Sequence, residues 1–145
     1  MPRLHTALID KWIQRLINSQ EALASASTLT HQDSGKHFLL NLAGGFTTTL
    51  PSPKAGWKAR FTVKTAPTTA YIIVTASSAN IVEGGVGSGE DASGSVACVS
   101  NADTITFVAN KAVAGDYIEL ESDGTSFFIN GNVLVQDGLT TTQAS

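Results

Sequence analysis

The clearest structural signal in this 145-residue chain is the segment Trp57-Lys58-Ala59-Arg60-Phe61-Thr62-Val63-Lys64-Thr65. The apolar side chains of this segment occupy every second position and are Trp57, Ala59, Phe61 and Val63. Lysine, arginine and threonine fill the positions between them. Because successive side chains of a β-strand point to opposite faces, the alternation predicts a strand with one buried face and one basic, exposed face.

Shorter β-type segments lie on both sides of this strand, at residues 37–42, 46–50, 71–75, 81–83, 95–100, 103–109, 117–122, 126–129 and 133–135. Turn-forming residues separate them, and the pairs Asp123-Gly124 and Asn130-Gly131 are typical of tight hairpins. Short strands at such regular spacing are typical of a β-sandwich or a jelly-roll-like barrel. We therefore predict a mainly β domain over residues 27–138, whose strand order the sequence does not specify.

The first 26 residues follow a helical period instead. Apolar side chains recur there at spacings of three and four, which predicts a short N-terminal amphipathic α-helix over residues 1–26. An isolated helix of this length is marginal in water, so its apolar stripe must pack either on the β-domain or on a partner chain. If the helix serves docking or oligomerisation, the expected contact residues are Leu4, Leu8, Trp12, Ile13, Leu16 and Ile17. In that case the chain without residues 1–26 should still fold.

Two further segments lack a strand pattern. Gly84–Gly94 is glycine-rich, and we predict a long, mobile excursion between strands there. It lacks the lysine of a phosphate-binding P-loop. Residues 139–145 are predicted to be a polar C-terminal tail, either disordered or laid onto a neighbouring subunit.

Charge is sparse and unevenly placed. Charged residues make up 14% of the chain, against about 25% in typical domains, which favours association with other protein surfaces. Residues 31–70 carry five basic residues and one acidic one, whereas residues 71–145 carry nine acidic residues and one lysine. This asymmetry indicates either complementarity between neighbouring copies or simple decoration of solvated strand faces. A basic face that could contact an acidic partner consists of Lys54, Lys58, Arg60 and Lys64.

Nothing in the sequence points to catalysis, and we expect neither an enzyme nor a cofactor. His31, Asp33 and His37 lie close together, but their spacing matches no zinc site, so we interpret them as ordinary loop and strand-entry residues. No nucleophile or oxyanion pattern accompanies the serines. The single cysteine, Cys98, excludes an intramolecular disulfide, and we expect it to be a small buried apolar residue.

The sequence also bears on nucleic acid, membrane and glycan partners. The aromatic side chains of the basic strand alternate to its inner face and the pI is about 5.5, so we expect no nucleic-acid binding. No apolar run approaches the ~18 residues of a membrane span, and charges interrupt any signal peptide. The alternative function of another class is a glycan-binding β-sandwich, which would need exposed aromatic side chains, whereas burial is expected for Trp57, Tyr71 and Tyr117.

Residues 27–138 resemble a group of small bacteriophage structural proteins associated with heads and fibres. The segments that carry the resemblance are Gly44–Pro51, Phe61–Pro67, Asp103–Val108, Gly115–Leu120 and Ser122–Thr125. Modules of this kind are typically trimeric. The resemblance implies a capsid decoration (cement) protein on the exterior of the virion, with the major capsid protein and other copies of itself as partners. The alternative within the same context is a head- or tail-fibre or adaptor module.

Overall fold

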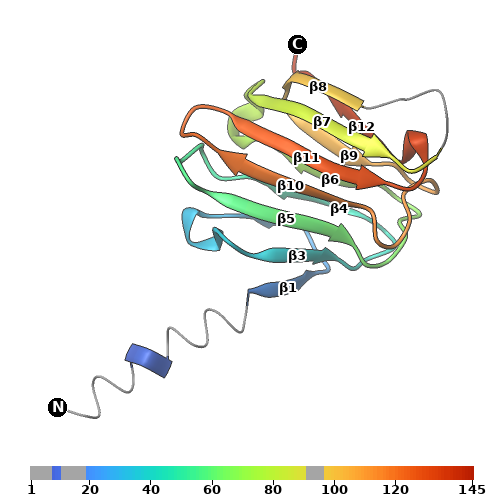
Figure 1. Cartoon of the computed structure of the whole chain (residues 1–145). Coiled ribbons are helices and arrows are strands. Elements are labelled where there is room, and N and C mark those ends of the chain that lie inside the picture. The colour runs from blue at the N-terminus through green and yellow to red at the C-terminus, as the bar shows by residue number, and fades with distance from the viewer. Residues whose placement is uncertain (1–7, 11–18, 91–96) are drawn as a thin grey trace.

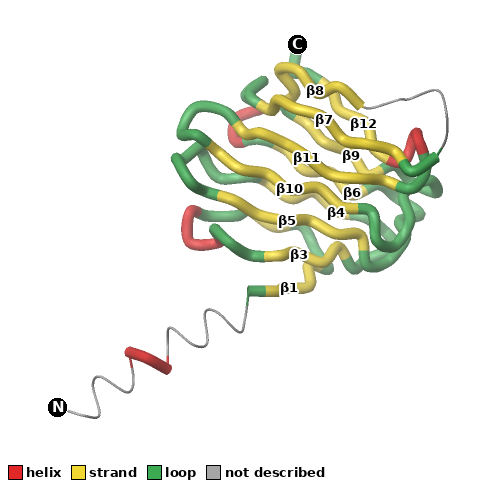
Figure 2. Tube along the Cα trace, in the orientation of Figure 1, coloured by secondary structure: helices red, strands yellow, loops and turns green. Residues whose placement is uncertain are grey.

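Two mixed β-sheets face each other across one hydrophobic core in the computed structural model of the chain (Figure 1). The structure describes residues 8–10, 19–90 and 97–145. Strands dominate these residues, and short 3-10 turns occur in the connections at His31–Asp33, Ala76–Ser78 and Gln136–Gly138 (Figure 2). The prediction of a mainly β fold with a sandwich architecture is therefore confirmed.

The larger sheet has seven strands in the order β1-β3-β5-β10-β11-β7-β8. Their bounds are β1 Gln20–Leu23, β3 His37–Leu40, β5 Lys58–Val63, β10 Tyr117–Ser122, β11 Phe127–Val133, β7 Val82–Ser88 and β8 Ala97–Ala102. The smaller sheet has five strands in the order β12-β9-β6-β4-β2. Their bounds are β12 Leu139–Thr142, β9 Thr104–Phe107, β6 Tyr71–Val74, β4 Phe46–Thr49 and β2 Ser27–Thr28.

The N-terminal half of the chain winds between the two sheets. Strands β1, β3 and β5 pair in parallel in the larger sheet, and β2, β4 and β6 pair in parallel in the smaller one. After each of these strands the chain passes to the opposite sheet, as in a β-solenoid. The C-terminal half adds antiparallel neighbours, β10 beside β5 and β9 beside β6. A parallel strand cannot be reached by a hairpin, which explains why local turn signals do not reveal this order.

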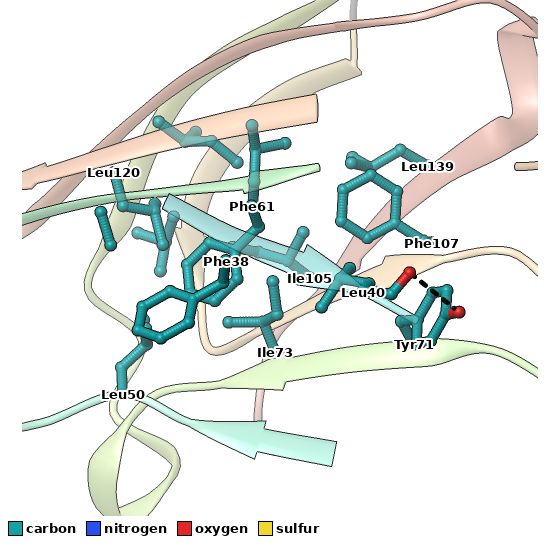
Figure 3. Packing of buried hydrophobic residues seen from close by; sticks show 14 of the residues in the cluster. Phe38, Leu40, Leu50, Phe61, Tyr71, Ile73, Ile105, Phe107, Leu120 and Leu139 are labelled. Carbon is teal, nitrogen blue, oxygen red and sulfur yellow. Dashed lines mark hydrogen bonds between the residues drawn. The ribbon is translucent and has the colours of Figure 1, made fainter. Parts of the chain in front are cut away.

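The core lies between the sheets and takes the apolar side chains that alternate along each strand (Figure 3). Trp57, Ala59, Phe61 and Val63 are all buried, as the alternation predicts. The rings of Phe38 and Phe61, which are register partners in β3 and β5, stack with their centroids 5.3 Å apart. Apolar burial on this scale is the main stabilising contribution to a domain of this size.

Tyr71 links the two sheets through its buried phenol group. The Tyr71 hydroxyl accepts a hydrogen bond from the backbone N–H of Leu42 at 2.9 Å and donates to the carbonyl of Thr65 at 2.8 Å. The carbonyl of Leu40 lies 3.2 Å away as a second acceptor (Figure 3). Burial raises the pKa of Tyr71, so the group stays a neutral donor and acceptor at ordinary pH.

The predicted helix is wrong at its C-terminal end. Residues 8–10 are helical, but Gln20–Leu23 forms strand β1, which pairs in parallel with β3 so that Leu23 lies opposite Leu40. Gln, Glu, Ala and Leu all favour helices in isolation. Here the open edge of β3 and the burial of Leu23 outweigh that preference, since helix propensity is a weak local effect.

The predicted C-terminal tail is also wrong, because Leu139–Thr142 forms strand β12. It pairs antiparallel with β9, and Leu139, opposite Phe107, is buried in the core. The run of threonines is compatible with this position because β-branched side chains suit a half-buried strand. The β-domain therefore extends beyond residues 27–138 in both directions.

Two glycine-based predictions fail for one reason, close approach of backbones. Gly84–Ser88 belongs to strand β7 and is not a mobile excursion, and a Cβ atom at Gly84 would overlap the carbonyl of Ile129 in β11. Asn130-Gly131 lies within β11 and forms no hairpin, and a Cβ at Gly131 would overlap the carbonyl of Tyr117 in β10. Asp123-Gly124, in contrast, connects β10 and β11 as a hairpin, as predicted.

Candidate functional site

The outer face of the seven-stranded sheet carries a groove of about 390 Å³ over β3, β5, β10 and β11. These strands lie side by side in the front layer of Figure 1. The polar lining comes from Lys36, His37, Lys58, Arg60, Glu119, Glu121 and Asn130. The alternation of each strand explains this composition, because the inward-facing partners of these residues fill the core.

Strand register places these side chains in two rows across the sheet. In the first row, Arg60 lies opposite His37 on one side and Glu119 on the other, and Glu119 lies opposite Asn130. In the second row, Glu121 lies between Lys58 of β5 and Phe128 of β11. Side chains that are directly opposite on one face of a sheet are close enough to interact.

The first row forms a bonded network that fixes the floor of the groove. Arg60 Nη1 donates to Glu119 Oε1 at 3.0 Å, and the Arg60 guanidinium carbon lies 4.0 Å from the centroid of the Tyr117 ring. His37 Nε2 and Thr62 Oγ1 are hydrogen-bonded at 2.7 Å. Arg60 is therefore held both by a carboxylate and by an aromatic face, an arrangement that suits the planar guanidinium group.

His37 lies at one end of this network with a lowered pKa. Burial lowers the pKa of the imidazole, and the positive charge of Arg60 lowers it further, while Glu119 acts in the opposite direction. The neutral ring is therefore favoured in the folded protein. His37 adds a neutral hydrogen-bonding group to the groove and no positive charge at neutral pH.

The polar groups of the second row are unpaired, and so is Asn130 at the β11 end of the first row. Within the described part of the chain, the side chains of Lys58, Glu121 and Asn130 make no hydrogen bond or ion pair with other protein groups. Phe128, beside Glu121, is 49% exposed although it is a large apolar side chain in the middle of a sheet. These exposed donors and acceptors are available to a ligand, whereas Arg60, Glu119 and Tyr117 are engaged with one another.

The predicted contact residues of the N-terminal helix are only partly within the described structure. Leu8 is 54% exposed and its neighbour Ile9 is 44% exposed. Leu4, Trp12, Ile13, Leu16 and Ile17 lie outside the described residues. The hydrophobic core as described begins at Leu23 and includes neither Leu8 nor Ile9.

The predicted basic face is present but is divided by acidic neighbours. Lys58 and Arg60 line the groove, while Lys54 precedes β5 and Lys64 follows it, both exposed. Strand β10 places Glu121 and Glu119 directly beside Lys58 and Arg60. Part of the charge asymmetry seen along the sequence is thus balanced within a single chain.

Three aromatic side chains were expected to be buried, and one is not. Trp57 and Tyr71 are buried, but Tyr117 is partly exposed on the outer face beneath Arg60. Sequence reasoning also did not identify Phe128, Glu121 and Asn130 as a group. Alternation along residues 117–122 and 127–133 places these side chains on one face of the sheet. The turn predicted at Asn130-Gly131 hides this alternation, because it ends the strand before Asn130.

The histidines and the aspartate of the region 31–37 do not converge. His31 Nε2 is hydrogen-bonded to the carbonyl of Ser52 at 2.9 Å, and Asp33 bonds Lys36 and the backbone of Thr30, whereas His37 lies on the sheet face. Burial raises the pKa of Asp33, but the bonds from Lys36 and Thr30 outweigh this and lower the pKa. Over residues 8–10, 19–90 and 97–145, no group of three or more His, Cys, Asp or Glu side chains is placed to hold a metal ion.

Two other sequence expectations concern Cys98 and membranes. Cys98 lies in β8, and its side chain is outside the described part of the structure, as are the last residues of Gly84–Gly94. None of the helices in the described residues is both long enough and apolar enough to span a membrane.

Comparison with known proteins adds no relative: no protein-family model and no curated protein sequence matches the chain.

Proposed function

We propose that the chain is a structural protein of a bacteriophage virion, and specifically a capsid decoration protein. In this proposal the N-terminal segment docks onto the major capsid protein or trimerises, and the β-sandwich forms a rigid body on the outside of the shell. The resemblance of residues 27–138 to phage head and fibre modules supplies the virion context. A head- or tail-fibre module is the alternative role within that context.

The observation that carries the docking part of the proposal is the exposure of Leu8 and Ile9, the two described residues of the N-terminal apolar stripe. Leu8 and Ile9 are 54% and 44% exposed, although both belong to a stripe whose sequence demands burial. The core from Leu23 to Leu139 is assembled without them. Neighbouring apolar side chains that a folded body leaves exposed, as it does Leu8 and Ile9, are typical of surfaces that bind another chain.

The first experiment measures protein composition in purified virions together with the mass of the isolated protein in solution. A copy number comparable with that of the major capsid protein supports decoration, whereas a few copies per particle support the fibre alternative. Light scattering should give the mass of a trimer. Absence of the protein from purified particles would overturn both roles.

The second experiment tests whether the N-terminal stripe makes the contact. Leu8→Glu should abolish incorporation into particles while the thermal unfolding of the β-domain is unchanged. Leu134→Glu is a matched control, since Leu134 is 60% exposed but lies on the β-domain after β11. If the Leu134 variant loses incorporation and the Leu8 variant does not, the docking surface is on the β-domain and the proposed role of the N-terminal segment is wrong.

A further inference from the structure

Lys58, Glu121 and Asn130, which line the groove, and Phe128, which lies beside Glu121 at its edge, form a small exposed surface. Phe128 and Asn130 project from β11 to the outer face, and Glu121 and Lys58 continue the same region across β10 and β5. Phe128 is exposed although Phe127, its neighbour in sequence, is fully buried. Phe128 is 49% exposed, and the three polar side chains have no partner in the described part of the chain, so all four are accessible to a ligand from outside the chain.

We propose that this surface is a carbohydrate-binding site in which Phe128 stacks against a sugar ring and Lys58, Glu121 and Asn130 bond the ring hydroxyls. This inference does not depend on the proposed virion role.

The donors and acceptors determine the chemical class of the ligand. Lys58 only donates hydrogen bonds, an ionised Glu121 only accepts them, and the amide of Asn130 does both. A ligand that satisfies all three must offer donors and acceptors at short intervals. Each sugar hydroxyl is both donor and acceptor, and the C–H face of a pyranose ring is apolar and fits the negative face of an aromatic ring.

The charge of the groove argues against anionic ligands. Its lining carries Lys36, Lys58 and Arg60 against Glu119 and Glu121, and Lys36 is already bonded to Glu21 and Asp33 at 2.8 Å each. Arg60 is likewise paired with Glu119. Lys58 is therefore the cation of this lining without a described partner, and Glu121 lies next to it. A phosphate or a nucleic-acid backbone needs an excess of unpaired positive charge, which this surface lacks.

The bonded groups of the first row, Arg60 and Glu119, support the strands from which the proposed site projects. Arg60, Glu119 and Tyr117 hold one another, and strand pairing fixes the positions along the sheet from which Lys58, Glu121, Phe128 and Asn130 project. The backbone of the site therefore needs no rearrangement on binding, which limits the entropy lost to that of the exposed side chains. Because the groove is open along the sheet face, an oligosaccharide chain can cross several strands.

The test is binding of the full chain to an array of neutral oligosaccharides, followed by titration of the best ligand in NMR and calorimetry. Phe128→Ala should weaken binding about tenfold or more, which is the size expected for a lost ring-stacking contact. Asn130→Ala and Glu121→Gln should also weaken it. Leu134→Ala is the matched control, since it removes an exposed apolar side chain outside the groove, and it should bind like the unaltered chain.

The outcomes separate the proposal from its competitors. Backbone NMR shifts of the unaltered protein should change at residues 119–121 and 128–130 when the oligosaccharide is added, and this readout does not depend on any variant folding. No oligosaccharide binding at millimolar concentration would overturn the proposal. Binding that is unchanged in the Phe128 and Asn130 variants, or shifts confined to another face, would overturn it as well. Binding only of an acidic peptide would assign the surface to a protein partner instead.

Discussion

Leu8 and Leu23 occupy equivalent positions in the apolar pattern, but the same substitution should lower the stability of the fold at only one of them. Leu8 and Leu23 both lie on the apolar stripe of the N-terminal segment. In the structure Leu8 is 54% exposed, whereas Leu23 is 7% exposed and packs in the core from strand β1. We therefore expect Leu23→Ala to destabilise the fold and Leu8→Ala to leave it unchanged.

The magnitude follows from the position of Leu23. Truncation of a buried leucine to alanine costs about 2–5 kcal/mol, and the lower half applies here because β1 is a short edge strand whose neighbours can relax. For a chain of this size, a loss of about 3 kcal/mol corresponds to a decrease in Tm of roughly 6–12 °C. Leu8→Ala should stay within about 0.5 kcal/mol, as surface substitutions do.

The assay is reversible urea unfolding followed by tryptophan fluorescence, since the buried Trp57 reports on the core. Two truncations complete the comparison. Removal of residues 1–18 should leave the unfolding midpoint unchanged. Removal of residues 1–26 should lower it, because Leu23 is lost together with the hydrogen bond from the N–H of Asn41 to the Leu23 carbonyl at 2.9 Å.

Equal destabilisation by Leu8→Ala and Leu23→Ala would refute this reasoning, because it would mean that both leucines pack in the core as one helix. A Leu8→Ala effect that appears only at high protein concentration has a different meaning. It would show that copies associate through the N-terminal segment, since association makes apparent stability depend on concentration.

Three further predictions address the core and the groove. Tyr71→Phe should cost about 1–3 kcal/mol in urea unfolding, because it leaves the N–H of Leu42 and the carbonyl of Thr65 without the phenol; an unchanged midpoint would contradict the bridging role. Thr48→Val should stabilise the protein by about 1 kcal/mol, because the Thr48 hydroxyl is fully buried and has no hydrogen-bond partner among the described residues; destabilisation would reveal a hidden bond. His37→Gln should make stability less dependent on pH below neutrality. Since the pKa of His37 is lowered in the folded state, the unfolded chain takes up a proton first as the pH falls through about 6.5, and the free energy of unfolding decreases there. Equal pH dependence in the unaltered and His37→Gln proteins would contradict this.

At the candidate site, one wrong turn prediction hides the outer face of strand β11. The alternation in Trp57–Val63 correctly predicts which side chains of β5 are buried and which are exposed. On β11 the same alternation would have placed Phe128 and Asn130 on the outer face. The Asn130-Gly131 pair has the chemistry of a hairpin turn, however, and that signal divided the strand in two. The structure shows that Gly131 instead allows the backbone of β10 to approach, which no local pattern can reveal.

The sequence by itself determined the fold class, the inner and outer faces of β5 and the hairpin at Asp123-Gly124, because each depends on neighbouring residues along the chain. Only the tertiary structure decided that Gln20–Leu23 and Leu139–Thr142 are strands, and that β5 lies between β3 and β10. It also decided that Lys58, Glu121 and Phe128 share one surface. Pairing between strands far apart in sequence depends on which edges the rest of the fold leaves open and which side chains it can bury. Those energies exceed the small intrinsic preferences of a four-residue segment.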